Sequence, residues 1–201
     1  MAQRTRELEQ TIERLQIRQA ELEAQANHDC LTGLASRRLL KDRFRCAVER
    51  AKRSGAAFAL LVIDLDGFKR INDTHGHAAG DLVLVEVAQR LAASLRTSDT
   101  AARVGGDEFV LIVECLSDPL ATNLICKKLK NAVSETIQLA SGVNVTIGAS
   151  VGQAIYADQG MDLDEMLVAA DQSMYACKAD AHKAMNAHAS LSATAPQARM
   201  H

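Results

Sequence analysis

Two short acidic segments carry the side chains best suited to chemistry. Asp64-Leu65-Asp66 ends the continuous apolar run 58–63, and Asp107-Glu108 directly follows the glycine pair Gly105-Gly106. Hard carboxylate oxygens that leave coordination positions open suit Mg²⁺ or Mn²⁺ bridging to substrate phosphates. Either segment taken alone is equally compatible with acids that cap loops, because acidic residues are common in loops.

The elements around these acids are expected to be neighbouring strands. The run 58–63 has no polar interruption, which predicts a strand buried on both faces. Gly105-Gly106 lies between two short apolar segments, a pattern typical of a hairpin whose tight turn needs φ > 0. Adjacent strands lie about 4.8 Å apart, so Asp64 and Asp107 are expected to reach one cation if they share a sheet. Regular alternation would send Asp107 and Glu108 to opposite faces unless the turn re-aims them.

Composition limits the class of protein. The chain has 201 residues, 48% of them hydrophobic, and a net charge of −2, which suits one globular domain with some extra helix. A nearly neutral charge argues against a nucleic-acid-binding protein. No apolar run approaches the length of a membrane span, and the charged N-terminus is unlike a signal peptide, so a cytoplasmic protein is expected. The five cysteines lack paired spacing and are expected to be reduced thiols.

Residues 1–27 are expected to form one helix with a heptad seam. Mainly apolar residues recur at alternating spacings of four and three: Leu8, Ile12, Leu15, Gln19, Leu22 and Ala26. We interpret the segment as a parallel dimer stalk, the end of a longer signalling helix. A surface helix packed on its own domain is the alternative, because three heptads are marginal for an isolated coil.

The remaining pattern predicts an α+β fold with a mainly antiparallel sheet flanked by helices. A helix is expected over 39–53, with Ser36 as its N-terminal cap and Ser54-Gly55 at its end. Further helices are expected over 82–95, from Pro119 to about 139, and 162–180, with a further strand over 143–156. Residues 184–201 are rich in Ala, Ser, His and Gln, a composition typical of a disordered tail.

Several separated motifs, in order, resemble those of the GGDEF domain family, the diguanylate cyclases. Segment 103–110 contains Gly-Gly-Asp-Glu-Phe, and 64–81 is similar to D-x-D-x-F-K-x-I-N-D-x-x-G-H-x-x-G-D. Segment 29–38 resembles D-x-L-T-G-L-x-N-R with Ser36 in place of the usual Asn, and 171–178 resembles D-x-A-x-Y-x-A-K. The likeness implies a palm-like cyclase domain over 28–183.

The resemblance implies that two GTP molecules are condensed to cyclic di-GMP and two pyrophosphates, with Mg²⁺ or Mn²⁺ as cofactor. Asp64, the carbonyl of Leu65, and Asp107 would hold the metal, which lowers the pKa of the attacking hydroxyl. Asp107 is also the family's position for the proposed general base. Glu108 is assigned to a second metal or to orientation, and Arg103 to charge stabilisation near the α-phosphate.

A guanine site is expected between residues 68 and 81. The Asn72 amide can donate to guanine O6, while the Asp81 carboxylate accepts from N1–H and the N2 amino group; adenine has the opposite polarity at that edge. The resemblance places His77 nearby, although a structural histidine is equally compatible. The remaining substrate-binding assignments are Phe68, Lys69, Gly105, Gly106 and Lys178.

Arg96-Thr97-Ser98-Asp99 stands where the family carries its R-x-x-D product-inhibition motif, so Arg96 and Asp99 are expected to bind cyclic di-GMP. Arginine can form a bidentate contact with guanine O6 and N7. The alternative is a basic residue at a helix C-terminus followed by a polar turn.

The interpretation is a diguanylate cyclase active as a homodimer, because one site holds one GTP and a ring-shaped product requires two sites face to face. Ala181-His182-Lys183 departs from the family's usual G-R-N, which puts the arginine contact to the phosphates in doubt. A catalytically inactive domain that binds cyclic di-GMP or GTP is the first alternative. A scaffold in which the coiled coil alone matters is the second, and it predicts no nucleotide binding.

Overall fold

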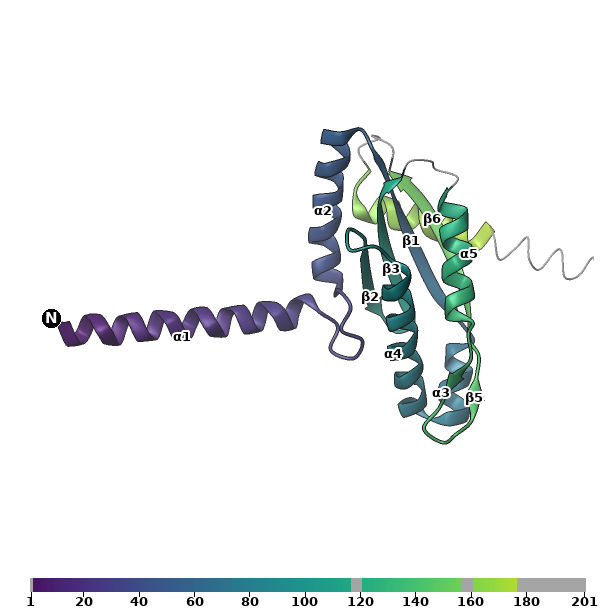
Figure 1. The fold of residues 1–201 in the computed structure, drawn as a ribbon, viewed down its shortest axis with the longest axis horizontal. Helices are drawn as coiled ribbons and strands as arrows, with labels where there is room; N and C mark the ends of the chain where they lie inside the picture. Colours follow the sequence, from purple (N-terminus) through teal and green to yellow (C-terminus); the bar gives the residue numbers. More distant parts are fainter. Residues whose placement is uncertain (1, 117–120, 157–160, 177–201) are drawn as a thin grey trace, which may run out of the picture.

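A four-stranded antiparallel sheet forms the centre of the molecule, as predicted (Figure 1). The computed structural model describes residues 2–116, 121–156 and 161–176. The strand order is β2-β3-β1-β6, where β1 spans Ala57–Asp66, β2 Thr100–Gly105, β3 Glu108–Leu116 and β6 Gly148–Tyr156. β1 pairs with β3 on one side and β6 on the other. The apolar run 58–63 therefore occupies an inner strand and is buried throughout.

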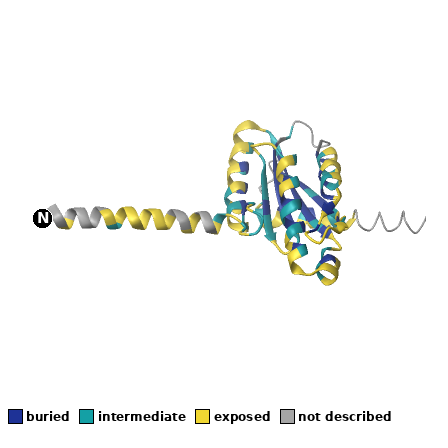
Figure 2. Cartoon of the chain, turned by 60° about the horizontal axis from the view of Figure 1, so that its bottom comes forward, coloured by how far each residue is buried: buried dark blue, intermediate teal, exposed yellow. Residues whose placement is uncertain are grey.

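Alternate residues of β1 face two separate cores. Leu61 and Ile63 belong to a core beneath α3 (Phe68–His75), α4 (His77–Ser94) and α5 (Ala121–Val133). Leu60 and Val62 belong to a second core beneath α2 (Arg37–Ser54) and the helical segment 163–176. Figure 2 shows the buried residues on the sheet and the inner helix faces, with exposed residues outside. Because both faces are covered, a strand without polar interruption is favoured.

The predicted boundaries of α2 are confirmed. Ser36 caps its start, with its side chain accepting from the Leu39 N–H, and Gly55 ends it with φ 69°. The helix expected over 82–95 is also present, although α4 starts earlier, at His77. Its apolar residues at helical spacing, Val83, Leu84, Val87, Ala88 and Leu91, are all buried.

The prediction of a helix from Pro119 to about residue 139 was wrong at its C-terminal end, and its start lies outside the described residues. α5 ends at Val133, and Ile137–Gln138 (β4) pairs with Asn144–Val145 (β5). The strand expected over 143–156 is accordingly divided between β5 and β6. Ile137 and Leu139 are buried in the α3–α5 core, so the short hairpin places apolar side chains where a longer helix would not.

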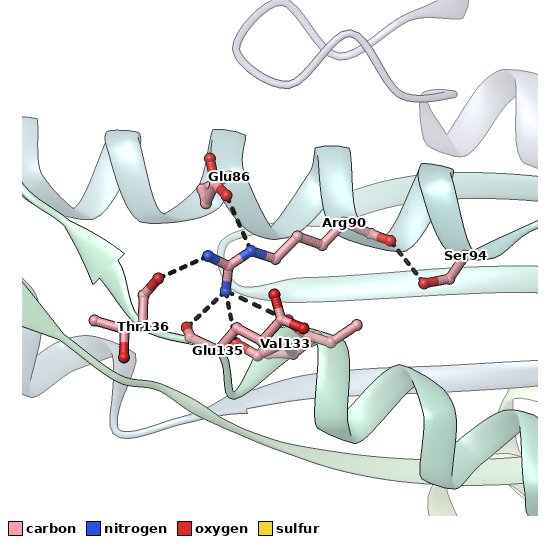
Figure 3. Close-up of polar contacts among 7 residues, drawn as sticks. Glu86, Arg90, Ser94, Val133, Glu135 and Thr136 are labelled. Carbon is pink, nitrogen blue, oxygen red and sulfur yellow. Dashed lines mark hydrogen bonds and ion pairs between the residues drawn. The ribbon is translucent and has the colours of Figure 1, made fainter.

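Arg90 of α4 binds the backbone carbonyls at the end of α5 and directly after it (Figure 3). Its guanidinium donates to the carbonyls of Val133, Glu135 and Thr136 at 3.4, 2.6 and 2.9 Å, and to that of Ala132 at 3.3 Å. Nε also contacts the Glu86 carboxylate at 2.9 Å. The last carbonyls of a helix have no partner within it, and a cation there also complements the helix dipole.

Helix α1 (Ala2–Asn27) extends away from the domain and contacts α2 near its C-terminal end (Figure 1). Three apolar residues of the predicted seam are mostly accessible: Ile12 at 54%, Leu15 at 62% and Leu22 at 51%. The chain's own domain therefore leaves this seam uncovered, which disfavours the alternative of a helix packed on its domain. Among the described helices, none combines the length and apolarity needed to cross a bilayer.

Candidate functional site

The diglycine segment forms the predicted hairpin turn. Gly106 and Asp107 are the turn residues between β2 and β3, and Gly105 and Gly106 have φ of 152° and 53°. A register irregularity between Arg103 and Gly105 adds a bulge directly before the turn. Bulges bend a strand and redirect side chains, so simple alternation does not decide where Asp107 points.

The two acidic segments meet across the sheet. Asp64 is the register partner of Glu108, and their side chains consequently share one face. Asp64 and Asp107 are partly exposed, Glu108 is exposed, and Leu65 is buried. The described residues contain no converging group of three or more His, Cys, Asp or Glu side chains. Mg²⁺ commonly uses one or two carboxylates together with substrate phosphates, so this donor set fits such an ion, and the cation shared by Asp64 and Asp107 stays a prediction.

The second acid of β1 has a different environment. Asp66 accepts a hydrogen bond from the Ser150 hydroxyl at 2.7 Å across the β1–β6 pair. A Cβ at Gly148 would lie 3.1 Å from the same carboxylate. Asp66 therefore joins β1 to β6 at the strand end.

Glu108 lines a cavity of about 410 Å³ on the face of the sheet that α2 covers. Val62 and Val110 form part of its floor, and Arg37 of α2 and Asp171 of segment 163–176 are among the charged residues that line it. Arg37 and Asp171 were not expected to be neighbours of the hairpin. They lie about 70 and 60 positions from Glu108, and nothing in the local pattern signals such a contact.

Arg103 forms hydrogen bonds that hold the β2–β3 turn in place. Its Nε and one terminal nitrogen donate to the carbonyl of Gly106 at 3.0 and 2.8 Å, and the other terminal nitrogen contacts Asp29 at 3.0 Å. Burial raises the pKa of Asp29, but hydrogen bonds from Thr32 and the hydrogen bond and charge of Arg103 outweigh it, so the pKa lies below its ordinary value of 3.8. The assignment of Arg103 to the α-phosphate stays a prediction, and the structure adds a positioning role that the sequence did not reveal.

The connection between α1 and α2 is hydrogen-bonded to β2, the strand that contains Arg103. The Ala35 N–H donates to the Ala101 carbonyl at 3.1 Å, and the Arg103 N–H donates to the Ala35 carbonyl at 2.9 Å. Ser36 in turn donates through its hydroxyl to the Ala26 carbonyl at 2.7 Å. The end of α1 is thus linked through one short connection to the strand that carries the diglycine turn.

The residues expected to read guanine lie at the α3–α4 junction, immediately after β1. Asn72 is partly buried on α3, and Asp81 is exposed in the first turns of α4. Gly80 precedes Asp81 and packs directly against the Asn72 side chain. The other assigned residues lie nearby in the chain: Phe68 is partly buried, and Lys69 and His77 are exposed. Lys178 lies outside the described residues.

Arg96 and Asp99 line a separate pocket of about 400 Å³. The Asp99 carboxylate accepts from the Arg96 N–H at 3.0 Å and from the Glu114 N–H at 3.1 Å, which fixes the turn against β3. Arg43 and Arg50 of α2 line the same pocket, which sequence spacing did not indicate. Arg50 is paired with the Glu114 carboxylate, so Arg43 and Arg96 are the cations of this pocket that favour an anionic ligand.

Comparison with protein families gives a match that covers most of the chain. The family model described as "Diguanylate cyclase, GGDEF domain" matches residues 26–184. All the positions that were singled out above, in the strand end, the α3–α4 junction, the turn and the pocket, fall within that range.

Curated proteins that are similar to this chain include named diguanylate cyclases. A bifunctional diguanylate cyclase/cyclic di-GMP phosphodiesterase, MucR of Pseudomonas aeruginosa, is 45% identical over 153 residues, which are 76% of this chain and 22% of that protein. The diguanylate cyclase DgcS of Shewanella oneidensis is 38% identical over 159 residues, which are 79% of this chain and 52% of that protein. The chain thus spans between a fifth and about half of the length of these relatives.

Solved structures share the fold. The GGDEF domain of TpbB from Pseudomonas aeruginosa superimposes with a TM-score of 0.72 at 37% identity, covering 76% of this chain and 89% of that one. The coiled coil and GGDEF domain of DgcB from Caulobacter crescentus, in complex with c-di-GMP, gives 0.79 at 28% identity, covering 88% and 93%.

Proposed function

The chain belongs to the GGDEF family of diguanylate cyclases, and from that premise we propose that it condenses two molecules of GTP into cyclic di-GMP. The observation that carries the proposal is the intact Gly-Gly-Asp-Glu-Phe turn, in which Glu108 pairs with Asp64 on the neighbouring strand β1. Carboxylates and a backbone turn lie near the end of β1, and the pair proposed to recognise the base lies at the α3–α4 junction that follows it. GTP is an intracellular nucleotide, so the site is proposed to face the cytoplasm.

In the proposed reaction, the 3′-hydroxyl of one GTP attacks the α-phosphorus of the other. A phosphorus–oxygen bond forms, the bond to the bridging oxygen of the leaving pyrophosphate breaks, and Asp107 accepts the hydroxyl proton. A second, equivalent attack closes the ring. Arg103 holds the carbonyl of Gly106 and so keeps Asp107, the next residue, in place.

Asp64, the Leu65 carbonyl and Asp107 would hold a divalent cation, with Glu108 available to a second one. The cation would neutralise developing charge on the phosphates when bound. Lys69 and Lys178 are proposed to contact the phosphates. Asn72 and Asp81 are proposed to recognise guanine, because a mismatched base would leave their polar groups unpaired.

The first test is product identification by mass after incubation with GTP and Mg²⁺. Wild-type protein is expected to form cyclic di-GMP, and Asp107→Asn is expected to reduce the rate by at least about 100-fold. Glu135→Gln is the matched control, because the Glu135 side chain is exposed and only its carbonyl contacts Arg90. The assay is repeated with Arg96→Ala added to all three proteins, so that product inhibition does not mask the difference in rate. Equal rates for Asp107→Asn and Glu135→Gln would contradict the mechanism.

We further propose a homodimer through α1, because two sites must face each other to close the ring. The uncovered apolar seam of Ile12, Leu15 and Leu22 fits a second copy of the same helix. Leu15→Pro should give a monomer that binds GTP and does not turn it over. Ile17→Ser is the control, since Ile17 is 57% exposed and lies off the seam. A fully active Leu15→Pro monomer would refute the dimer.

Product inhibition is proposed at the pocket of Arg96 and Asp99. Arg96→Ala should raise the cyclic di-GMP concentration that halves the rate by at least about tenfold, because a charged hydrogen-bond donor is removed. Initial rates at low product should remain near wild type. Unchanged inhibition would exclude Arg96 from the product site.

A binding module without catalysis is the second candidate, and the departure at Ala181-His182-Lys183 favours it. It predicts that GTP or cyclic di-GMP binds while no cyclic di-GMP forms in the mass assay. Absence of any nucleotide binding would instead favour the scaffold.

A further inference from the structure

Gly80 lies where α3 and α4 pack together. It belongs to the first turns of α4, is buried, and directly precedes Asp81. A glycine in a helix interior is destabilising relative to alanine, so the position calls for a packing reason. The atoms around it supply one.

A Cβ at Gly80 would coincide with the side chain of Asn72. The built atom lies 1.9 Å from Asn72 Oδ1, 2.9 Å from Cγ and 3.2 Å from the Cζ of Phe68. The space that a methyl group would fill is therefore occupied by the amide that is proposed to read the base. Both displaced groups are the outer ends of side chains.

Gly152 shows what a purely structural glycine looks like in the same chain. A Cβ there would lie 2.1 Å from the backbone oxygen of Ala170 and 2.7 Å from the Cβ of Met174. Those atoms cannot move without shifting segment 163–176 against β6. At Gly80 the amide can rotate away instead, so a substitution there changes the site before it changes the fold.

We propose that Gly80 is a positioning residue that holds the Asn72 amide beside Asp81 for recognition of guanine. The inference rests on the proposed function and deepens it, because it identifies what sets base specificity. With Oδ1 against the glycine, Nδ2 is the end of the amide left to donate to guanine O6. A methyl group at position 80 pushes the Asn72 amide out of that orientation. Asp81 is then left to recognise the base without the Asn72 amide.

The test compares nucleotide affinities in a double-mutant cycle. Wild type, Gly80→Ala, Asn72→Ala and the double variant are titrated calorimetrically with α,β-methylene GTP and α,β-methylene ATP, whose α–β linkage resists cleavage. Gly80→Ala should weaken binding of the GTP analogue at least about tenfold and reduce the preference over the ATP analogue. In the Asn72→Ala background the same substitution should change affinity less than about twofold, because no amide remains to displace.

The outcomes separate this inference from the function on which it rests. Failure of the wild type to bind either analogue contradicts the proposed function and this inference together. Binding by the wild type, with an equal loss from Gly80→Ala in both backgrounds, overturns the inference alone and assigns the glycine to helix packing. Full affinity of Gly80→Ala in the wild-type background overturns it as well. Thermal melting of all four proteins checks the fold, and a Gly80→Ala protein that does not fold also contradicts the inference.

Discussion

Two arginines with nearly the same exposure, Arg90 at 14% and Arg103 at 13%, stabilise two different regions of the molecule. Each forms one ion pair and donates to backbone carbonyls. Arg90 joins α4 to the end of α5 and to the segment that leads into β4 (Figure 3). Arg103 joins the α1–α2 connection to the turn that carries Asp107. The same chemistry therefore sets stability in one region and site geometry in the other.

The largest loss of stability is expected from Arg90→Met, which keeps the apolar stem and removes the guanidinium. Several carbonyls and the Glu86 carboxylate lose a charged donor, so the free energy of unfolding should fall by about 2–4 kcal/mol. Urea unfolding followed by circular dichroism measures it. Activity per folded molecule should stay at the wild-type level. A stability within about 0.5 kcal/mol of wild type would show that water replaces these contacts.

Arg103→Met should have a smaller effect on stability and a larger one on turnover. Because the guanidinium contacts one carboxylate and one carbonyl, we expect a loss of about 1–2 kcal/mol in the free energy of unfolding. The rate of cyclic di-GMP formation should fall at least about tenfold, since the turn before Asp107 loses its support. The comparison between the two arginines fails if Arg103→Met is as active per folded molecule as Arg90→Met.

Asp29→Asn sharpens the comparison through its pH dependence. The pKa of Asp29 is depressed in the folded state, so its contribution is present above the unfolded value and is lost as the pH falls through the folded pKa. The stability gap between wild type and Asp29→Asn should be constant from about pH 7 to about pH 5, at about 1 kcal/mol, and should narrow below about pH 4. Urea unfolding at a series of pH values measures it. A gap that widens on acidification would reverse the sign of the pKa shift.

Local patterns predicted much of this architecture. The uninterrupted apolar run gave β1 because strands buried on both faces lack polar residues, and Gly105-Gly106 gave the hairpin because few residues adopt its φ values. Ser36 and Gly55 marked the ends of α2 through capping preferences that act over one turn. Each of these signals is contained within a few consecutive residues.

Contacts between distant segments were not predictable in the same way. Arg103 and Asp29 are 74 positions apart, and Arg90 contacts carbonyls 42 to 46 positions away. The end of α5 was misplaced, and the carbonyls there are bound by Arg90, a residue of another helix. The fit of the Asn72 amide against Gly80 likewise depends on how two helices pack, although the family resemblance had marked Asn72 itself. Spacing in one sequence carries no record of such pairings.

The smallest expected effect is at Ser36, which lies on the same connection as the Asp29 partner of Arg103 but carries no charge. Its hydroxyl accepts from the Leu39 N–H at a long 3.4 Å and donates to the Ala26 carbonyl at 2.7 Å. Ser36→Ala should therefore lower the free energy of unfolding by about 0.5–1 kcal/mol, and Ser36→Asn should recover the part due to capping, since Asn and Ser cap equally well. Thermal and urea unfolding of the two variants measure the difference. Ser36→Ala should leave turnover near the wild-type level. If it instead reduces turnover as much as Arg103→Met does, the Arg103–Asp29 pair is not what positions the turn, and the whole connection between α1 and α2 has that role.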